Sequence, residues 1–323
     1  MKLQILVPQY NETDDDVRIL LSSIYTQQGI DLGSNIEVLI GNDGSITKLS
    51  RAILDSFSYH VHYSQFEHSG MAGGRKKLFE MATADYVMFC DADDMFLSNL
   101  ALYKIFSFME EGYDAIICDF LEERRDEAGR VQFIPHKRDG SFVHGKVYRR
   151  QFLLDNGVVW YPGFEYHEDS SYNLLAVHLA KKIKLCDEPL YLWKWRDGSV
   201  SRQTLFHMKT FTRVIYSNEY LLRDLLARGE IVAAKIYACM LMYYTYFSLN
   251  ASIWHEVQNA QYLYDTEKCF QDWFRKYHDL AFNMPIQAEK QIIETTREKA
   301  VKRGLVIERI TFQDWIKHIE ELE

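Results

Sequence analysis

The sequence predicts an α/β fold with a mostly parallel sheet covered by helices on both faces, followed by a helical C-terminal region. Three observations lead to this prediction. Short apolar runs alternate with helix-like runs over about the first two-thirds of the 323 residues, several of these runs end in polar turn residues, and long helical runs follow after about residue 204. Because helices separate successive strands, we expect parallel pairing in βαβ units.

The strands and helices follow from the apolar pattern in chain order. The first apolar run ends at Pro8, and the second ends in a turn that contains Gly44. Strands are predicted at residues 3–7, 37–41, 60–63, 85–90 and 114–118. Helices are predicted at residues 17–24, behind a cap at Asn11 or Thr13, and at 73–81 and 100–109.

The change of pattern divides the chain into an α/β domain, residues 1–203, and a helical region, residues 204–323. We expect the second part to serve packing, assembly into a homo-oligomer or ligand binding. Residues 236–255 carry no formal charge, which approaches the length of a membrane span. Tyr, Ser, Thr and Asn are frequent there, so we expect a buried helix and no transmembrane segment, with a membrane contact as the alternative.

Charge and cysteine content narrow the class of protein. The net charge of −9 provides no general basic field, which argues against nonspecific binding of nucleic acid or anionic lipid. The five cysteines form no CxxC pair, which indicates reduced thiols rather than a disulfide framework or a zinc site. The first apolar run is too short for a signal peptide. These features predict a cytoplasmic protein.

Polar side chains follow three of the predicted strands at the point where each strand ends. The first strand leads into Pro8, Tyr10 and Glu12, the second into Asp43, and the fourth into Asp91. In open α/β sheets, ligands bind beyond the carboxyl ends of the strands. If these strands are parallel neighbours, their polar ends meet at one edge of the sheet, and we expect a ligand site there.

Two carboxylates, Asp91 and Asp93, bracket Ala92 directly after a strand. Oxygen ligands in this arrangement suit a hard divalent ion such as Mg²⁺ or Mn²⁺. Such an ion completes its shell with phosphate oxygens and offsets the charge on a departing diphosphate. An acidic turn that caps the next helix is the alternative, and the polar ends of the neighbouring strands favour the ion site.

Residues 69–75, which include Gly70 and Arg75, have glycine spacings that match neither a dinucleotide-binding fingerprint nor a Walker loop. A flexible loop is one interpretation. Backbone N–H groups at the start of the next helix, with Arg75 and Lys76, are also suited to cradle a phosphate or a nucleotide edge.

The acidic pair Glu168–Asp169 falls in the first turn of a predicted helix. Carboxylates in that position stabilise a helix through its dipole, which is a purely structural role. Near a metal-held diphosphate, one of them is suited to act as general base on an alcohol. Further along, residues 193–202 gather aromatic rings, cations and hydroxyls, including Ser199 and Arg202.

In their order and spacing, these polar and glycine-rich motifs resemble those of the family 2 glycosyltransferases of GT-A fold, over roughly residues 1–203. The similar segments are Pro8-x-Tyr10-Asn11, Asp43, Gly70 through Arg75, Asp91-x-Asp93, Glu168-Asp169 and, as in bacterial wall-polymer and capsule members, residues 144–149 and 199–202. No QxxRW motif follows the acidic pair, which argues against a processive polysaccharide synthase.

The resemblance implies a donor site for a nucleotide-diphosphate sugar, expected to be UDP-linked, with Mn²⁺ or Mg²⁺ as cofactor. Asp93 would bind the metal, and Asp91 would hold the ribose or support the metal. Asp43 and Arg75 would fix the nucleobase side, and Arg202 would close on the diphosphate. The remaining donor-binding residues implied are Pro8, Tyr10, Glu12, Gly70, Ala92 and Ser199.

The resemblance also implies an inverting transfer to a hydroxyl-bearing acceptor. Asp169 would take the proton of the acceptor hydroxyl, with Glu168 as the substitute, while the oxygen attacks the anomeric carbon opposite the leaving group. The acceptor stays open: a wall polyol, a growing polysaccharide, a protein side chain or a hydroxylated base in phage-type DNA. Residues 204–323 are expected to contribute packing, oligomerisation or acceptor binding.

Two other classes of protein compete with this interpretation. One is a nucleotide-sugar-binding or scaffold protein without turnover, against which the intact set Asp91, Asp93 and Asp169 argues. The other is a Rossmann dehydrogenase, which the missing GxGxxG after the first strand contradicts.

Overall fold

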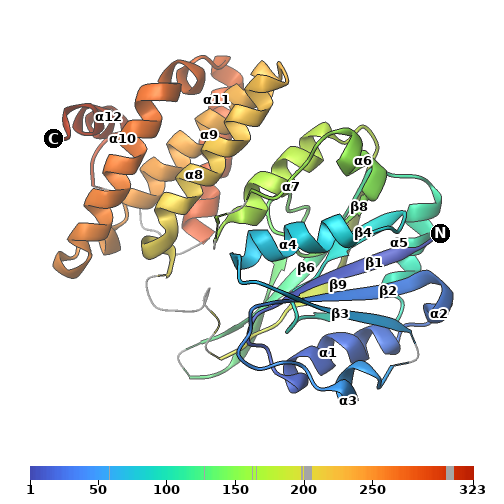
Figure 1. Cartoon of the computed structure of the whole chain (residues 1–323). Coiled ribbons are helices and arrows are strands. Elements are labelled where there is room, and N and C mark those ends of the chain that lie inside the picture. The colour runs from blue at the N-terminus through green and yellow to red at the C-terminus, as the bar shows by residue number, and fades with distance from the viewer. Residues whose placement is uncertain are drawn as a thin grey trace. The chain divides into compact units, whose positions relative to one another are not determined.

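A computed structural model describes residues 1–57, 59–126, 128–161, 163–164, 166–197, 199, 206–302 and 309–323. The chain divides into two compact units, Met1–Ser199 and Val200–Glu323. The first unit is built around one sheet, and the described part of the second consists of helices (Figure 1).

The sheet of the first unit has nine strands in the order β3-β2-β1-β4-β8-β6-β9-β5, with β7 paired to β6. The strands are β1 Leu3–Gln9, β2 Ile36–Asp43, β3 His60–Phe66, β4 Tyr86–Phe89, β5 Met95–Phe96, β6 Ala115–Arg125, β7 Val131–His136, β8 Lys146–Arg149 and β9 Ile183–Trp193. The helices are α1 Asp14–Tyr25, α2 Leu32–Asn35, α3 Arg51–Leu54, α4 Gly70–Met81, α5 Ala101–Glu110, α6 Arg150–Asp155 and α7 Glu168–Leu179.

The two faces of the sheet carry separate apolar cores, because successive side chains of a strand point to opposite faces. On β1, Ile5 and Val7 belong to one core and Leu6 to the other. The first core includes buried residues of α1 and α5, and the second includes buried residues of α4, α6 and α7. Helices therefore cover both faces, as the sequence predicts (Figure 1).

Each predicted strand overlaps a strand of the sheet, and β3, β2, β1 and β4 pair in parallel as expected. The other half is mixed: β8 runs antiparallel to both β4 and β6, whereas β9 is parallel to β6. One helix start differs from expectation. α4 begins at Gly70 rather than Gly73, so the glycine-rich stretch forms the first turn of the helix.

Gly145, just before β8, has a backbone conformation and a close contact that exclude larger residues. Its φ is +69°, and a Cβ atom there would lie 2.7 Å from the carbonyl oxygen of Cys118. We expect Gly145→Ala to lower the free energy of unfolding by about 2–4 kcal/mol, measured by chemical denaturation. Gly112→Ala is the matched control, because its φ of +73° is similar but the space around it is open. A loss of only about 1 kcal/mol is expected there, and equal losses would contradict the packing argument.

In the second unit, the described helices pack around α9. They are α8 Phe206–Ala227, α9 Ile231–Leu249, α10 Ala260–Phe282, α11 Ile286–Lys302 and α12 Phe312–Glu321, with short 3-10 turns at Ser252–His255 and Val257–Asn259. α9 packs against α8, α10 and α11, and eleven of its residues are buried, including Thr245 and Ser248. This is the buried helix that the uncharged stretch predicts. Within the described residues, every helix is too short or too polar to span a membrane.

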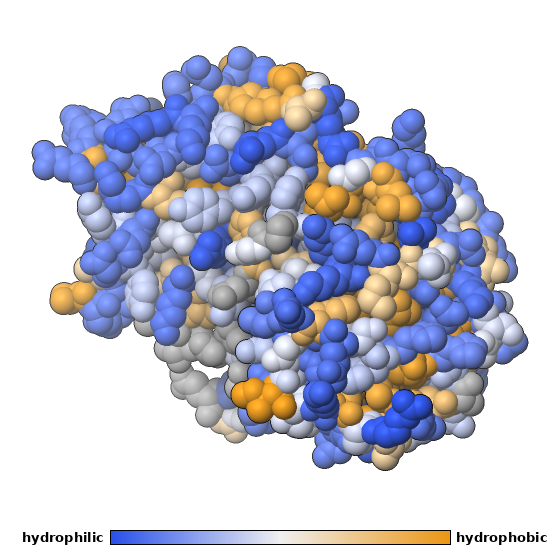
Figure 2. Space-filling view, in the orientation of Figure 1, coloured by the Kyte–Doolittle hydropathy of each residue, from blue (hydrophilic) through white to orange (hydrophobic). Residues whose placement is uncertain are grey.

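On the face shown in Figure 2, hydrophilic side chains dominate, and apolar side chains form separate groups among them. Aromatic residues make up 14% of the protein, and many of their rings lie in the interior. Rings such as Trp160, Tyr172 and Tyr191 are buried in the first unit, and Trp254 and Trp273 in the second. Aromatic rings therefore contribute to the buried interior of each unit.

Candidate active site

The carboxyl ends of β2, β1 and β4 lie side by side at one edge of the sheet, because these strands are parallel neighbours. At this edge, Gln9 of β1 is in register with Asn42 of β2, and the Cys90 N–H donates to the Leu6 carbonyl at 3.0 Å. The polar residues that follow each strand therefore start from one edge, as the sequence predicts.

Asp43, at the end of β2, is buried and is held by the segment before α4. Its carboxylate accepts hydrogen bonds from the Ser69 backbone N–H at 2.9 Å and from the Ser69 hydroxyl at 2.8 Å. Nδ1 of His68 lies 3.1 Å from the same carboxylate, and the His68 ring stacks on Tyr10 with the centroids 4.7 Å apart. Because Tyr10 is 46% exposed, an aromatic surface is open beside a buried carboxylate, which suits a nucleobase.

Small residues in the first turn of α4 allow its close approach to the strand ends. A Cβ atom on Gly73 would lie 2.4 Å from Ser69 Oγ, so any larger residue would displace the hydroxyl that holds Asp43. The backbone of Gly74 packs near Asp43 and Pro8, whose Cβ atoms lie 3.7 Å from the position of an added Cβ. The glycine-rich stretch therefore serves packing at the sheet edge.

Arg75 joins the turn after β4 to the start of α7. Its Nη2 donates to Oδ1 of Asp91 at 2.8 Å, and its Nη1 donates to Oε1 of Glu168. The guanidinium is 3% exposed and lies 5.2 Å from the ring centroid of Trp160, in cation–π contact. Burial raises the pKa of Asp91, but the neighbouring positive charges, led by Arg75, together outweigh this effect, and the net pKa lies below its ordinary value.

Asp94 anchors the turn that carries Asp91 and Asp93. Its Oδ2 accepts a hydrogen bond from the Tyr191 hydroxyl at 2.8 Å, and its Oδ1 accepts one from the Lys194 backbone N–H at 2.8 Å. The Tyr191 hydroxyl accepts in turn from the Asp91 N–H at 3.1 Å. Burial raises the pKa of Asp94 well above its ordinary value. These bonds fix the turn after β4 to the end of β9.

Asp93 is paired with a cation from the segment that follows β9. Nε of Arg196 lies 2.7 Å from Oδ2 of Asp93, and Nη2 lies 3.1 Å from Oε1 of Glu12. Burial raises the pKa of Glu12 to about 7, although Arg196 opposes the effect. Burial likewise raises the pKa of Asp93 against the influence of Arg196. One guanidinium therefore bridges carboxylates from the ends of β1 and β4.

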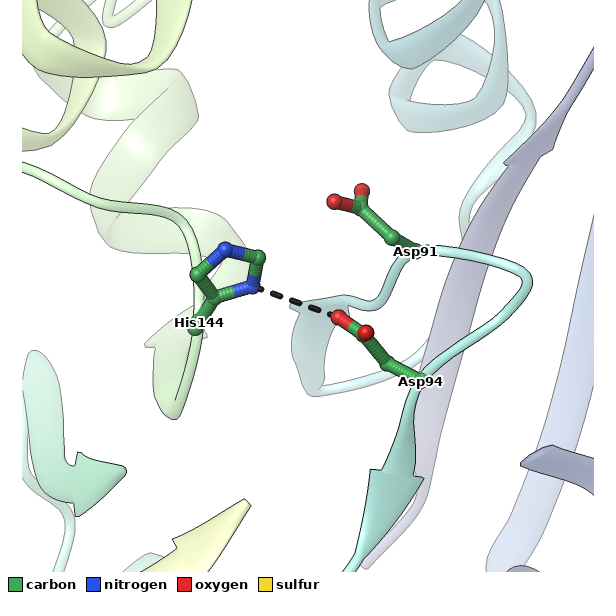
Figure 3. Close-up of side chains that lie close together, drawn as sticks. All are labelled: Asp91, Asp94 and His144. Atoms are coloured by element: carbon green, nitrogen blue, oxygen red, sulfur yellow. Dashed lines mark ion pairs between the residues drawn. The ribbon is translucent and has the colours of Figure 1, made fainter. Parts of the chain in front are cut away.

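Asp91, Asp94 and His144 bring candidate metal ligands within 4.8 Å of one another (Figure 3). In Figure 3 both aspartates extend from the turn after β4, and His144, just before β8, faces them. Nδ1 of His144 is buried, lies 3.5 Å from Oδ2 of Asp94 and makes no hydrogen bond within the described part of the chain. Burial lowers the pKa of His144 to about 4, which keeps the imidazole neutral, the form that ligates metals. This donor set fits a divalent ion such as Mn²⁺.

The acidic pair opens α7 on the other side of Arg75. Oδ2 of Asp169 accepts a hydrogen bond from the Val143 backbone N–H at 3.2 Å. Burial raises the pKa of Glu168 to about 7 and that of Asp169 to about 6, although Arg75 opposes both effects. The fully buried Lys146 adds a further positive charge that favours ionised Asp169. A carboxylate with a pKa near 6 is a stronger base than the free side chain.

The other predicted site residues are placed as follows. Ala92 is buried within the turn after β4, and Gly70 begins α4 with a φ of +74°. The Ser199 N–H donates to the Arg196 carbonyl at 3.2 Å. Arg202 lies outside the described residues. We expected Arg75 on the nucleobase side, but its guanidinium forms ion pairs with the carboxylates of Asp91 and Glu168. Contact between Arg75 and a nucleobase therefore stays a prediction.

Sequence reasoning assigned no role to four residues that the structure brings to this site. They are Asp94, His144, Lys146 and Arg196. A signal existed for two of them, since Asp94 directly follows the predicted metal ligands and Arg196 lies within the singled-out stretch 193–202. His144 and Lys146 lie in a segment noted only for its resemblance.

A doubly covered α/β sheet with a carboxylate-rich edge beside α4 and α7 is the arrangement expected of a glycosyltransferase of GT-A fold. The family model described as "Glycosyl transferase family 2" matches residues 4–164, and the chain belongs to this family. The resemblance in the sequence is thereby confirmed.

Similar proteins agree with this assignment. "Uncharacterized glycosyltransferase YibD" of Escherichia coli (strain K12) is 24% identical over 244 residues, which cover 68% of each chain. Among solved structures, S. aureus TarS 1–349 in complex with UDP-GlcNAc has a TM-score of 0.61 at 17% identity and covers 95% of this chain and 93% of that chain. The mannosyltransferase PcManGT of Pyrobaculum calidifontis, in complex with GDP-Man and Mn²⁺, has a TM-score of 0.51 at 12% identity and covers 99% and 84%.

Proposed function

We propose that this glycosyltransferase moves a sugar from a UDP-sugar to an acceptor hydroxyl, with inversion at the anomeric carbon and a divalent metal ion. The observation that carries the proposal is the bridge formed by Arg75. It connects Asp91, at the predicted donor edge, to Glu168, which adjoins the predicted base Asp169. Two fold relatives support the donor class, because TarS was solved with UDP-GlcNAc and PcManGT with GDP-Man and Mn²⁺.

On the donor side, the open face of Tyr10 would stack on the base, and Asp43 with Ser69 and His68 would border it. Asp93 and Asp91 would hold the metal, which would offset negative charge on the departing diphosphate. Asp94 and His144, which lie beside Asp91, would be available as further ligands, although both oxygens of Asp94 also accept hydrogen bonds that anchor the turn.

On the acceptor side, Asp169 would accept the proton of the attacking hydroxyl. The acceptor oxygen forms the new bond to the anomeric carbon as the bond from that carbon to the diphosphate oxygen breaks. Because the attack comes from the face opposite the leaving group, one displacement inverts the anomeric centre. The Val143 N–H would orient the carboxylate of Asp169, and Arg75 and Lys146 would keep it ionised near neutral pH.

Ligand-induced stabilisation tests the donor class directly. We expect UDP with Mn²⁺ to raise the melting temperature, because a ligand that binds only the folded state stabilises it by about 2.7 kcal/mol at 100 times its Kd. NAD at the same concentration is the control and is expected to have no effect. Stabilisation by NAD and none by UDP with Mn²⁺ would refute the proposal.

Turnover and acceptor are tested by incubation with arrays of nucleotide sugars and acceptors, followed by mass spectrometry of the products. A mass increase of one sugar on a hydroxyl acceptor separates an enzyme from a nucleotide-sugar-binding or scaffold protein. NMR of the anomeric proton then tests inversion. Glycosylated DNA as the product would identify the hydroxylated-base alternative.

A further inference from the structure

The guanidinium of Arg196 lies where a metal ligated by Asp93 needs an oxygen. Its Nε is 2.7 Å from Oδ2 of Asp93, within direct ion-pair distance. A divalent ion that binds this oxygen would bring a second cation to the same point. The two cations repel each other, and one carboxylate oxygen cannot satisfy both at full strength. Metal binding through this oxygen of Asp93 therefore requires Arg196 to move or to release the contact.

Glu12 offers Arg196 a second anchor. Nη2 of the same guanidinium lies 3.1 Å from Oε1 of Glu12, which comes from the end of β1 rather than β4. If Asp93 is taken by metal, Arg196 still has a buried carboxylate with which to pair. The arrangement contains one cation and two carboxylates, so it carries a net negative charge that favours the approach of a further cation.

The backbone around Arg196 is fixed independently of these ion pairs. The Lys194 N–H donates to Asp94 at 2.8 Å, and the Trp195 N–H donates to Oε2 of Glu123 at 3.3 Å. The release of Asp93 therefore requires only a rearrangement of the Arg196 side chain, which is 30% exposed.

We propose that Arg196 is an internal counter-ion that competes with the divalent metal for Asp93, and that metal loading leaves Arg196 paired with Glu12 alone. This inference rests on the proposed function, because it takes Asp93 as the metal ligand. It assigns Arg196 the role of setting metal affinity and Glu12 the role of receiving the displaced cation.

Titration of free Mn²⁺ by electron paramagnetic resonance, without nucleotide, tests the competition. Arg196→Gln is expected to raise Mn²⁺ affinity at least about fivefold, since a partly buried ion pair no longer opposes the metal. Arg196→Lys keeps the charge but loses the fork that bridges both carboxylates, so it is also expected to raise affinity. A general charge effect predicts no change for this second variant. Arg51→Gln is the matched control, because that side chain is 87% exposed and, among the described residues, forms an ion pair only with Asp55.

Glu12→Gln tests the second anchor. Without the Glu12 carboxylate, Asp93 is the one of these two carboxylates that remains for Arg196. Arg196 then competes more strongly with the metal, so Mn²⁺ affinity is expected to fall several-fold. In the Arg196→Gln background the same substitution is expected to have a clearly smaller effect, because no displaced cation needs Glu12. Additive effects in this double-mutant cycle would mean that Glu12 and Arg196 act independently, which would overturn the inference.

The failure of the inference can be told apart from the failure of the proposed function. If wild-type protein shows Mn²⁺-dependent binding of UDP but Arg196→Lys and Arg196→Gln leave Mn²⁺ affinity unchanged, the competition is wrong and the function stands. If wild-type protein binds no Mn²⁺ even with UDP, metal use itself is wrong and the inference falls with it. Thermal unfolding of each variant verifies that the fold is retained.

Discussion

Asp93→Ala is expected to abolish metal-dependent turnover and leave the fold intact. Asp93 follows β4 at the sheet edge and is the carboxylate that we assign to the metal. Loss of one oxygen ligand from a hard-metal site should cost several kcal/mol of stabilisation of the departing diphosphate. At about 1.4 kcal/mol per factor of ten, turnover should fall about 100-fold or more. The measurement is kcat at saturating donor and Mn²⁺, with thermal unfolding as the test of the fold.

The matched control for this variant is Asp15→Ala, which removes the same charge from a side chain that is 97% exposed and only weakly paired with Arg18. It is expected to retain wild-type turnover. Undiminished transfer by Asp93→Ala, or full wild-type activity in a strong chelator, would show that Asp93 holds no metal required for the reaction.

The parallel half of the sheet was predictable because its strands are buried on both faces. β1 and β2 are almost entirely buried, so each appears in the sequence as a short apolar run that ends in polar residues. The other half gives weaker signals. β9 is mostly exposed or half-buried over its first seven residues and has a run of only three buried residues, β8 has four residues, and β5 has two. Their pairing depends on tertiary contacts, which short patterns do not encode.

The candidate site, too, was predictable from the sequence only in part. The placement of Asp43, Asp91 and Asp93 at one edge was predictable, because each lies at or shortly after the end of a buried strand and parallel strands bring their ends together. The pairing of Arg196 with Asp93 joins residues 103 positions apart, and no local spacing marks it. The burial of Arg75 between two carboxylates was also hidden, since a sequence shows the charge of a residue but not its exposure.

The surroundings of Asp169 make it a stronger base than a free carboxylate. A free carboxylate has a pKa near 4 and accepts a proton poorly from an alcohol in the ground state. Burial raises the pKa of Asp169 to about 6, which brings it closer to neutral pH while leaving it ionised there. As pH falls through about 6, the carboxylate takes up a proton and loses its function as a base. Turnover of the wild type should therefore decline on the acid side of about pH 6.

Asp169→Asn is expected to bind donor nearly as well as the wild type and to lose turnover. Asparagine keeps the shape and an oxygen that accepts the Val143 N–H, but it cannot take up the acceptor proton. Removal of a general base costs about 10²–10⁴-fold in rate, whereas loss of a helix-capping carboxylate costs only about 1 kcal/mol of stability. Calorimetric titration of UDP with Mn²⁺, beside a turnover assay, separates the two roles. If the variant keeps more than about a tenth of wild-type turnover, well above that ~10²-fold loss, the base lies elsewhere, and Glu168, paired with Arg75, becomes the first candidate.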